Sequence, residues 1–272
     1  MWRRHPLLLI ALLLGFGFLY LPIISLVVYS FNESRLVTVW GGFSTHWYGE
    51  LLNNRPLLNA AWLSIKIAAL NATLAVILGT LAAIALVRFG KHRGHKSLGV
   101  MVTAPLVIPE IVIGLSLLLM FVTLEDLIGW PAGRGQLTIL LAHVTFSMAY
   151  VTVIVQSRLK HMDRSLEDAA LDLGARPLTV FFTITLPLIT PALIAGWLLA
   201  FTLSMDDLVV ASFVSGPGAT TLPMVIYSSV RLGVNPQINA LATIMIAIVS
   251  IAVLLLGIVT YRREIKKQQA RP

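Results

Sequence analysis

The sequence predicts an all-α membrane protein, and three observations support this fold class. Of the 272 residues, 57% are hydrophobic and only 12% are charged, which is unlike a water-soluble domain. Apolar runs of the roughly 20 residues that a helix needs to cross a bilayer recur along the whole chain. Cysteine is absent, so disulfide bonds and thiolate metal ligands play no part in the fold. Stability must therefore come from helices that pack against one another in lipid.

Six apolar runs are predicted to be transmembrane helices, joined by loops too short to hold a soluble domain. The first run follows a basic start, but it exceeds the roughly 7 to 15 residues of a signal-peptide core, so we expect it to be retained. The fifth run is too long for one simple span, and we expect a break near Asp206 and Asp207. The predicted spans are Leu7 to Phe31, Ala60 to Phe89, Ser97 to Leu124, Gln136 to Val155, Phe181 to Val214 and Ile238 to Tyr261.

Basic residues in the loops predict the orientation. Four of them, Arg35, Arg55, Arg134 and Arg231, lie on one side of the predicted spans, whereas fifteen lie on the other. Cytoplasmic loops carry the excess of Lys and Arg, so both termini are predicted to be cytoplasmic. The net charge of +8 then reflects topology and contact with anionic lipid, and we expect no nucleic-acid binding. The fifteen are Arg3, Arg4, Arg88, Lys91, Arg93, Lys96, Arg158, Lys160, Arg164, Arg176, Arg262, Arg263, Lys266, Lys267 and Arg271.

A short amphipathic helix is predicted in the cytoplasmic loop between the fourth and fifth spans. Ser165 and Asp168 match a capping pattern for its start, and Gly174 suits the left-handed turn that ends a helix. Pro177 discourages continuation of the helix. An apolar face in the cytoplasm predicts a partner protein that covers it, and the alternative is a helix lying on lipid. That face consists of Leu166, Ala169, Ala170 and Leu173, at i, i+3, i+4, i+7 spacing.

The same loop resembles a known family. The spacing D-A-A-x3-G-x9-I-x-L-P, from Asp168 to Pro187, is similar to the signature loop of the inner-membrane permeases of binding-protein-dependent ABC importers. Asp168 stands where that family usually has Glu, which keeps the charge. The resemblance implies the type I importer (MetI-like) permease fold, with a first helix and outer loop in 1–59, a permease domain in 60–260 and a cytoplasmic tail in 261–272. It also implies that the loop forms a helix that couples to an ATPase through Leu166, Asp168, Ala169, Ala170, Leu173 and Gly174.

Three further stretches narrow the resemblance to the permeases of polyamine importers, and of putrescine importers in particular. They are "YSFNESRLVTVWGGFSTHWYGELL" (29–52), "APLVIPEIVIGLSLLL" (104–119) and "LSMDDLVVASFVSGPGATTLPM" (203–224). The resemblance implies a bacterial inner-membrane protein that works by alternating access. The implied partners are a second homologous permease of the PotH type, two ATPase subunits of the PotG type and a periplasmic substrate-binding protein of the PotF type.

The chain lacks the motifs of an enzyme or an ATPase. A phosphate-binding loop of the form G-x4-G-K-[ST] is missing, so ATP and magnesium are expected on the partner ATPase, and no cofactor, catalytic residue or metal ligand is predicted here. One alternative is an ion-coupled secondary transporter, which typically shows two related halves. Another is a membrane enzyme or an assembly subunit, for which a convergent set of nucleophile, acid or metal ligands should appear in the spans. A third is a permease for a different small organic or metal cation.

Three carboxylates are predicted to line the substrate path. Glu110 lies in the otherwise apolar third predicted span, where an ionisable group is costly and therefore functional by default. The alternative is a structural ion pair between Glu110 and Lys66. Asp206 and Asp207 follow at the outer end of the fifth run, and neighbouring helical positions point about 100° apart. We therefore expect one of them to face the path and the other to cap a helix or bind a partner. Carboxylates of this kind can pair with the ammonium groups of a polyamine.

Overall fold

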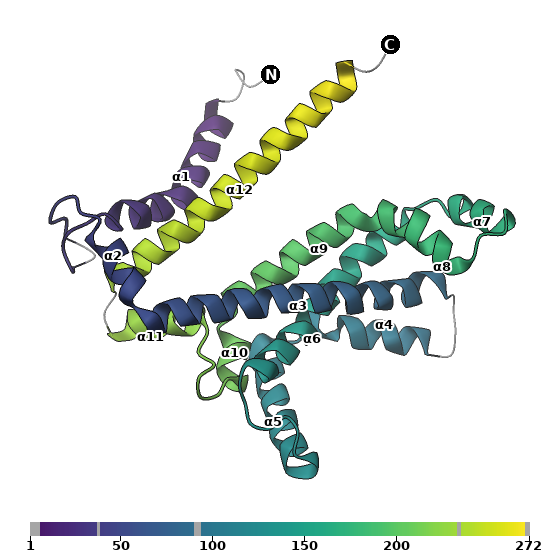
Figure 1. Cartoon of the computed structure of the whole chain (residues 1–272), viewed down its shortest axis with the longest axis horizontal. Helices are drawn as coiled ribbons and strands as arrows, with labels where there is room; N and C mark the ends of the chain where they lie inside the picture. Colours follow the sequence, from purple (N-terminus) through teal and green to yellow (C-terminus); the bar gives the residue numbers. More distant parts are fainter. Residues whose placement is uncertain (1–5, 37–38, 90–93, 233–234, 270–272) are drawn as a thin grey trace. The chain divides into compact units, whose positions relative to one another are not determined.

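A computed structural model describes residues 6–36, 39–89, 94–232 and 235–269, and it confirms the all-α prediction for them (Figure 1). Arg3, Arg4, Lys91, Arg93 and Arg271, used above to predict orientation, lie outside the described residues. The elements are α1 (Pro6–Tyr29), α2 (His46–Asn53), α3 (Arg55–Arg88), α4 (His95–Thr103), η2 (Ala104–Leu106), α5 (Glu110–Ile128), α6 (Gln136–Lys160), α7 (Ser165–Asp172), α8 (Pro177–Val180), η3 (Phe181–Thr185), α9 (Leu186–Asp206), α10 (Val209–Val214), α11 (Leu222–Leu232) and α12 (Pro236–Gln269).

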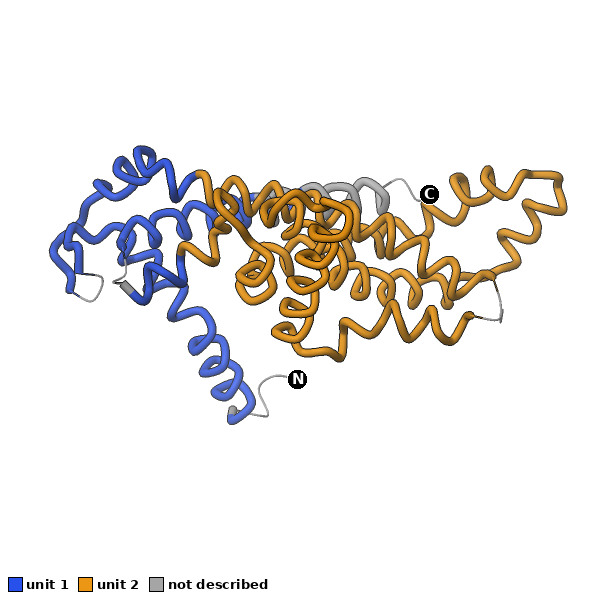
Figure 2. The backbone as a smooth tube through the Cα atoms, turned by 90° about the horizontal axis from the view of Figure 1, so that it is seen from below, with its two compact units in different colours: residues 1–58, 226–272 blue, residues 59–225 orange. Residues whose placement is uncertain are grey.

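The helices divide into two compact units (Figure 2). Unit 1 combines residues 1–58 with residues 226–272, and unit 2 consists of residues 59–225. Within unit 1, α12 packs against α1 and α2. The buried Trp47 donates a hydrogen bond from Nε1 to the carbonyl oxygen of Asn32 at 2.6 Å. The domain limits expected from the sequence, 1–59, 60–260 and 261–272, stay a prediction.

Five described stretches have the length and apolar composition of membrane spans. They are Leu7–Tyr29, Arg55–Arg88, Glu110–Ile128, Gln136–Lys160 and Pro177–Asp206. The sixth predicted span falls within α12, whose apolar part in the described residues, Pro236–Ile251, is shorter. A stretch of suitable length and composition therefore overlaps each of the first five predicted spans, with different bounds at the third, and helix α12 occupies the sixth.

The third predicted span, Ser97 to Leu124, is wrong as a single helix. The structure divides it into α4, the 3₁₀ turn η2 and α5. Pro105 falls within η2 and Pro109 directly precedes α5. Proline has no N–H to donate to a carbonyl of the preceding turn, so two prolines four residues apart interrupt the regular helix between α4 and α5.

Small residues allow α3, α6 and α9 to pack closely in unit 2. Ala68, Ala72 and Ala75 of α3 are fully buried. A Cβ added to Gly79 of α3 would lie 2.9 Å from the side chain of Val151 on α6, so only glycine fits this contact. Small side chains let membrane helices approach one another and gain dispersion energy without a hydrophobic driving force.

A buried amide adds a polar contact between the same three helices. Asn71 of α3 donates to the Ser147 hydroxyl of α6 at 3.0 Å and to the Ala200 carbonyl of α9 at 2.9 Å. Asn71 is fully buried, so these bonds replace the ones that water cannot supply there. The α3, α6 and α9 bundle is thus the scaffold on which the functional residues of unit 2 sit.

The start of α9 is widened into a π-helical turn. In η3 the amide of Leu186 bonds to the carbonyl of Phe181, five residues earlier. Pro187 follows directly and has no N–H to continue the regular pattern. Single π turns of this kind frequently occur at functional sites, and this one lies where α9 meets α7.

Candidate functional site

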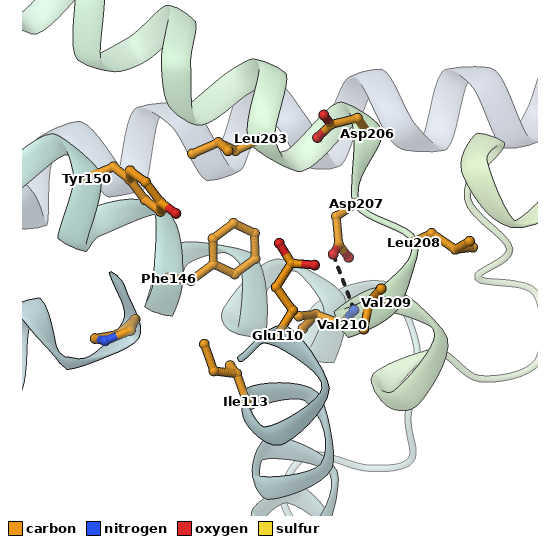
Figure 3. A pocket seen from close by; sticks show the side chains of 11 residues that line it. Glu110, Ile113, Phe146, Tyr150, Leu203, Asp206, Asp207, Leu208, Val209 and Val210 are labelled. Atoms are coloured by element: carbon orange, nitrogen blue, oxygen red, sulfur yellow. Dashed lines mark hydrogen bonds between the residues drawn. The ribbon is translucent and has the colours of Figure 1, made fainter. Parts of the chain in front are cut away.

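An acidic cavity in unit 2 contains all three carboxylates predicted for the substrate path. The cavity measures about 250 Å³. In Figure 3 the side chains of Glu110, Phe146 and Tyr150 point toward the space beside the segment that carries Asp206 and Asp207. The lining residues are Pro105, Glu110, Ile113, Phe146, Tyr150, Leu203, Asp206, Asp207, Leu208, Val209 and Val210. Residues that are almost 100 positions apart in the sequence therefore meet at one place.

Glu110 reaches the cavity from the first turn of α5. The sequence placed it in the middle of a span, which is wrong because the chain breaks at Pro109 and α5 begins at Glu110. The first turn of a helix carries partial positive charge from its free amides, which favours a carboxylate there. Glu110 is exposed, and no ion pair joins it to Lys66 among the described residues. The structural-pair alternative is therefore not supported.

Asp206 and Asp207 occupy the predicted break in the fifth run. Helix α9 ends at Asp206, Asp207 has extended backbone angles, and α10 begins at Val209. The carboxylate of Asp207 accepts hydrogen bonds from the amides of Val210 at 3.2 Å and Ala211 at 2.7 Å, so it caps α10. Asp207 is buried, whereas Asp206 is exposed at the cavity. Asp207 therefore has the capping role that the sequence left open between the two.

A buried histidine that the sequence analysis missed holds Asp207 from the other side. His143 of α6 lies 3.1 Å from Asp207 through Nε2 and 2.6 Å from the hydroxyl of Ser204 through Nδ1. Its exposed fraction is 1%. A lone histidine in an apolar helix gives no signal of its partners when they lie more than 60 residues away. The available signal was the position of His143 within a predicted span, because a polar side chain in the membrane needs hydrogen-bonding partners.

Two aromatic rings were also missed as cavity residues. Phe146 and Tyr150 are four residues apart on α6, so they lie on the same face of that helix. Each is only partly buried, and each lines the acidic cavity. Aromatic faces attract cations through their quadrupole, which suits a cavity already lined by carboxylates.

The predicted cytoplasmic helix forms α7, and its apolar face is uncovered in the chain. None of the residues of α7 is buried. Leu166 is 48% exposed, and Leu173, directly after the helix, is 90% exposed. Ala169 is exposed and Ala170 is partly exposed, so the small residues of this face are accessible as well. An apolar helix face of this kind is what a partner protein would cover.

The two ends of α7 test the capping predictions in opposite ways. The predicted Ser165 and Asp168 capping pair is wrong, because Ser165 is already helical and its amide donates instead to the carboxylate of Asp163 at 2.9 Å. That hydrogen bond lowers the pKa of Asp163, because it stabilises the ionised carboxylate. The prediction for Gly174 is confirmed by its φ of +85°. The amide of Gly174 bonds to Leu171 and the next amide to Ala170, which is a Schellman motif.

Glu167 ties α7 to the membrane helices. Its carboxylate pairs with Arg88 at the end of α3 at 3.0 Å and accepts a hydrogen bond from the Thr185 hydroxyl in η3 at 2.6 Å. Arg164 adds a hydrogen bond to the carbonyl of Val87 at 2.7 Å. These contacts connect α7 to the end of α3 and to the η3 turn that leads into α9. The acidic cavity lies at the other end of α9, about 30 Å away for a helix of 21 residues.

Comparison with known proteins identifies the family. The family described as binding-protein-dependent transport system inner membrane component matches residues 75–263. The putrescine transport system permease protein PotI of Escherichia coli (strain K12) is 64% identical over 248 residues, covering 91% of this chain and 88% of that protein. The spermidine/putrescine transport system permease protein PotC of the same strain is 46% identical over 233 residues, covering 86% of each.

Solved structures agree on the fold. A bacterial alginate ABC transporter, in complex with an alginate pentasaccharide-bound periplasmic protein, matches with a TM-score of 0.72 at 16% identity, covering 96% of this chain and 94% of that chain. The MetNI methionine ABC transporter matches with a TM-score of 0.56 at 16% identity, covering 76% of this chain and 95% of that chain. These findings confirm the resemblance and the MetI-like fold predicted from the sequence. The chain belongs to the family of inner membrane components of binding-protein-dependent transport systems.

Proposed function

We propose that the chain is a permease subunit of an ATP-driven importer for polyamines, with putrescine as the substrate and alternating access as the mechanism. The observation that carries the proposal is the meeting of Glu110, Asp206 and Asp207 at one cavity in a chain whose relatives include putrescine and spermidine/putrescine permeases. A diamine presents two ammonium groups joined by methylenes, which calls for separated carboxylates with apolar surface between them.

The cavity offers both kinds of surface. Asp207 already bonds to His143 and to the amides of α10, which leaves Glu110 and Asp206 as the carboxylates available for substrate ammonium groups. Tyr150 and Phe146 offer ring faces, and the aliphatic lining suits a methylene chain. Charge-assisted hydrogen bonds can then replace the water that an ammonium group loses.

We assign the coupling to ATP to α7. A partner ATPase would bind ATP and magnesium and would cover the apolar face of that helix. Leu166, Ala169, Ala170 and Leu173 would form the apolar contact, with Asp168 at its charged edge and Gly174 setting its end. Movement of α7 would pass through Glu167 to α3 and α9, and α9 carries Asp206 at its far end. The further partners are a second permease of the PotH type, two ATPase copies of the PotG type and a periplasmic binding protein of the PotF type.

Radiolabelled uptake by the co-expressed complex tests this function. Putrescine should accumulate only when ATP is supplied, and unlabelled putrescine should compete better than amino acids or sugars. If an unrelated organic cation or a metal ion competed more strongly than putrescine, that class of cation would be the substrate instead. Uptake that follows an ion gradient without ATP would contradict the ATP-driven importer.

Both termini are proposed to be cytoplasmic, on the excess of basic residues in the loops on that side. A green fluorescent protein fused after Gln269 should therefore fluoresce. Alkaline phosphatase, which is active only outside the cytoplasm, should be active when inserted near Asn53 and inactive when fused after Gln269. The reverse pattern of phosphatase activity would contradict the orientation.

A further inference from the structure

Three buried polar side chains form a hydrogen-bonded row beside the acidic cavity. It runs from Ser204 of α9 through His143 of α6 to Asp207, with heavy-atom distances of 2.6 Å and 3.1 Å. Asp207 lines the cavity, whereas His143 and Ser204 are not among its lining residues. The order of the side chains resembles that of a hydrolase triad, but the serine is only 5% exposed, so its hydroxyl has no access to a substrate.

The chemistry of the three side chains determines which groups in this row donate and which accept hydrogen bonds. An ionised carboxylate only accepts, so the His143 Nε2–H donates to Asp207. In a neutral imidazole Nδ1 is then the acceptor and the Ser204 hydroxyl the donor, whereas in an imidazolium Nδ1–H donates to that hydroxyl. Asp207 thus fixes Nε2 of His143 as a donor, and His143 adds a third hydrogen bond to a carboxylate that also receives the amides of Val210 and Ala211.

Helix α6 holds the short helix α10 at both of its ends. At the start of α10, His143 bonds to the capping Asp207. At its end, the buried Thr138 hydroxyl donates to the carbonyl of Val214 at 2.7 Å. Because α10 is only six residues long, its placement depends on these contacts more than on its own stability. These two hydrogen bonds from α6, together with the packing of α10 against α5, fix the position of α10 and with it the break between α9 and α10.

Asp206 is the last residue of α9 and stands directly before this break. We propose that His143 is a positioning residue that acts through Asp207 to fix the break and so holds the Asp206 side chain at the acidic cavity, ready for a cationic substrate. The inference deepens the proposed function and rests on it for the role of Asp206. His143 itself touches no substrate.

The absence of cysteine from the chain allows a direct test of side-chain position. In the assembled complex, Asp206→Cys supplies the only thiol of this subunit, and its labelling rate by the cationic reagent trimethylammonium-ethyl methanethiosulfonate reports its access from the cavity. Adding His143→Leu should lower that rate by about tenfold, the effect of losing a hydrogen bond to a charged group. His143→Gln, which keeps an N–H donor, should lower it less.

The matched control is Thr152→Val, an isosteric change on the same helix at a buried residue whose hydroxyl donates to the Met148 carbonyl within α6. It should leave the labelling rate within about twofold, a difference too small to count as a lost hydrogen bond. An unchanged rate in both His143 variants would overturn the proposal. If both His143 variants and Ser204→Ala fail to assemble, His143 has a folding role and the proposal is equally wrong.

Uptake separates this inference from the proposed function. On the Asp206→Asn background, His143→Gln should cost less than about twofold in initial putrescine uptake, because its effect passes through the missing carboxylate. If uptake by the double variant fell by the product of the two single reductions, the substitutions would act independently, and the positioning role would be contradicted. A normal rate for Asp206→Asn alone would instead contradict the role of Asp206 in substrate transport, whatever the thiol labelling shows.

Discussion

Asp206→Asn is expected to lower the initial rate of putrescine uptake about tenfold or more, because a charge-assisted hydrogen bond to the substrate is worth about 1.5 to 3 kcal/mol. Asp206 is exposed at the cavity and bonds to no other side chain in the described residues, so removing its charge should leave the fold intact. Glu110→Gln should act in the same direction for the same reason. The measurement is uptake normalised to the amount of assembled complex.

The control for this expectation is Asp126→Asn, at an exposed position near the other end of α5 that does not line the cavity. It should transport at the parent rate. Asp207→Asn should behave differently from both, because Asp207 caps α10 and bonds to His143, so its loss should also reduce assembly. Near-normal uptake by both Asp206→Asn and Glu110→Gln would remove the acidic-cavity hypothesis.

Ala169→Arg is expected to abolish productive coupling, with uptake lost although the permease still folds. Ala169 is exposed on α7, so a large charged side chain fits the isolated subunit but would block the close approach of an ATPase. The measurements are co-purification of the ATPase, ATP hydrolysis and uptake in the same preparation. Leu171→Arg is the matched control, because Leu171 lies about 200° around the helix from Ala169 and is also exposed. Equal uptake in the two variants would contradict docking on this face.

Gly174→Val should uncouple transport for a different reason. The φ of +85° disfavours any β-branched side chain by about 1 to 2 kcal/mol, although no neighbouring atom lies within 4 Å of an added Cβ. Gly174→Asn is the matched control, because asparagine tolerates the left-handed conformation. We expect uptake to fall in the valine variant and to be largely kept in the asparagine variant. An equal loss of uptake in both variants would show that transport does not depend on the left-handed conformation at Gly174.

Local chemistry made parts of the functional site predictable. Two adjacent carboxylates in an apolar run mark a place where the helix cannot continue undisturbed, and α9 does end at Asp206. A glycine after an amphipathic stretch marks a left-handed turn, and Gly174 adopts one. A local signal was wrong at the start of α7, where Ser165 is already helical and its amide bonds to the carboxylate of Asp163.

By itself, the sequence determined the membrane class, the helical fold, the break in the fifth run and the exposed helix with its family signature, because each follows from composition or from residues within one or two helical turns. Only the tertiary structure decided which carboxylate is free. Asp207 and His143 are 64 positions apart, and Glu167 and Arg88 are 79 apart. Such pairs form because helix packing brings distant polar groups together, in the case of His143 and Asp207 where water cannot satisfy them, and no local pattern records which partner a polar group will meet.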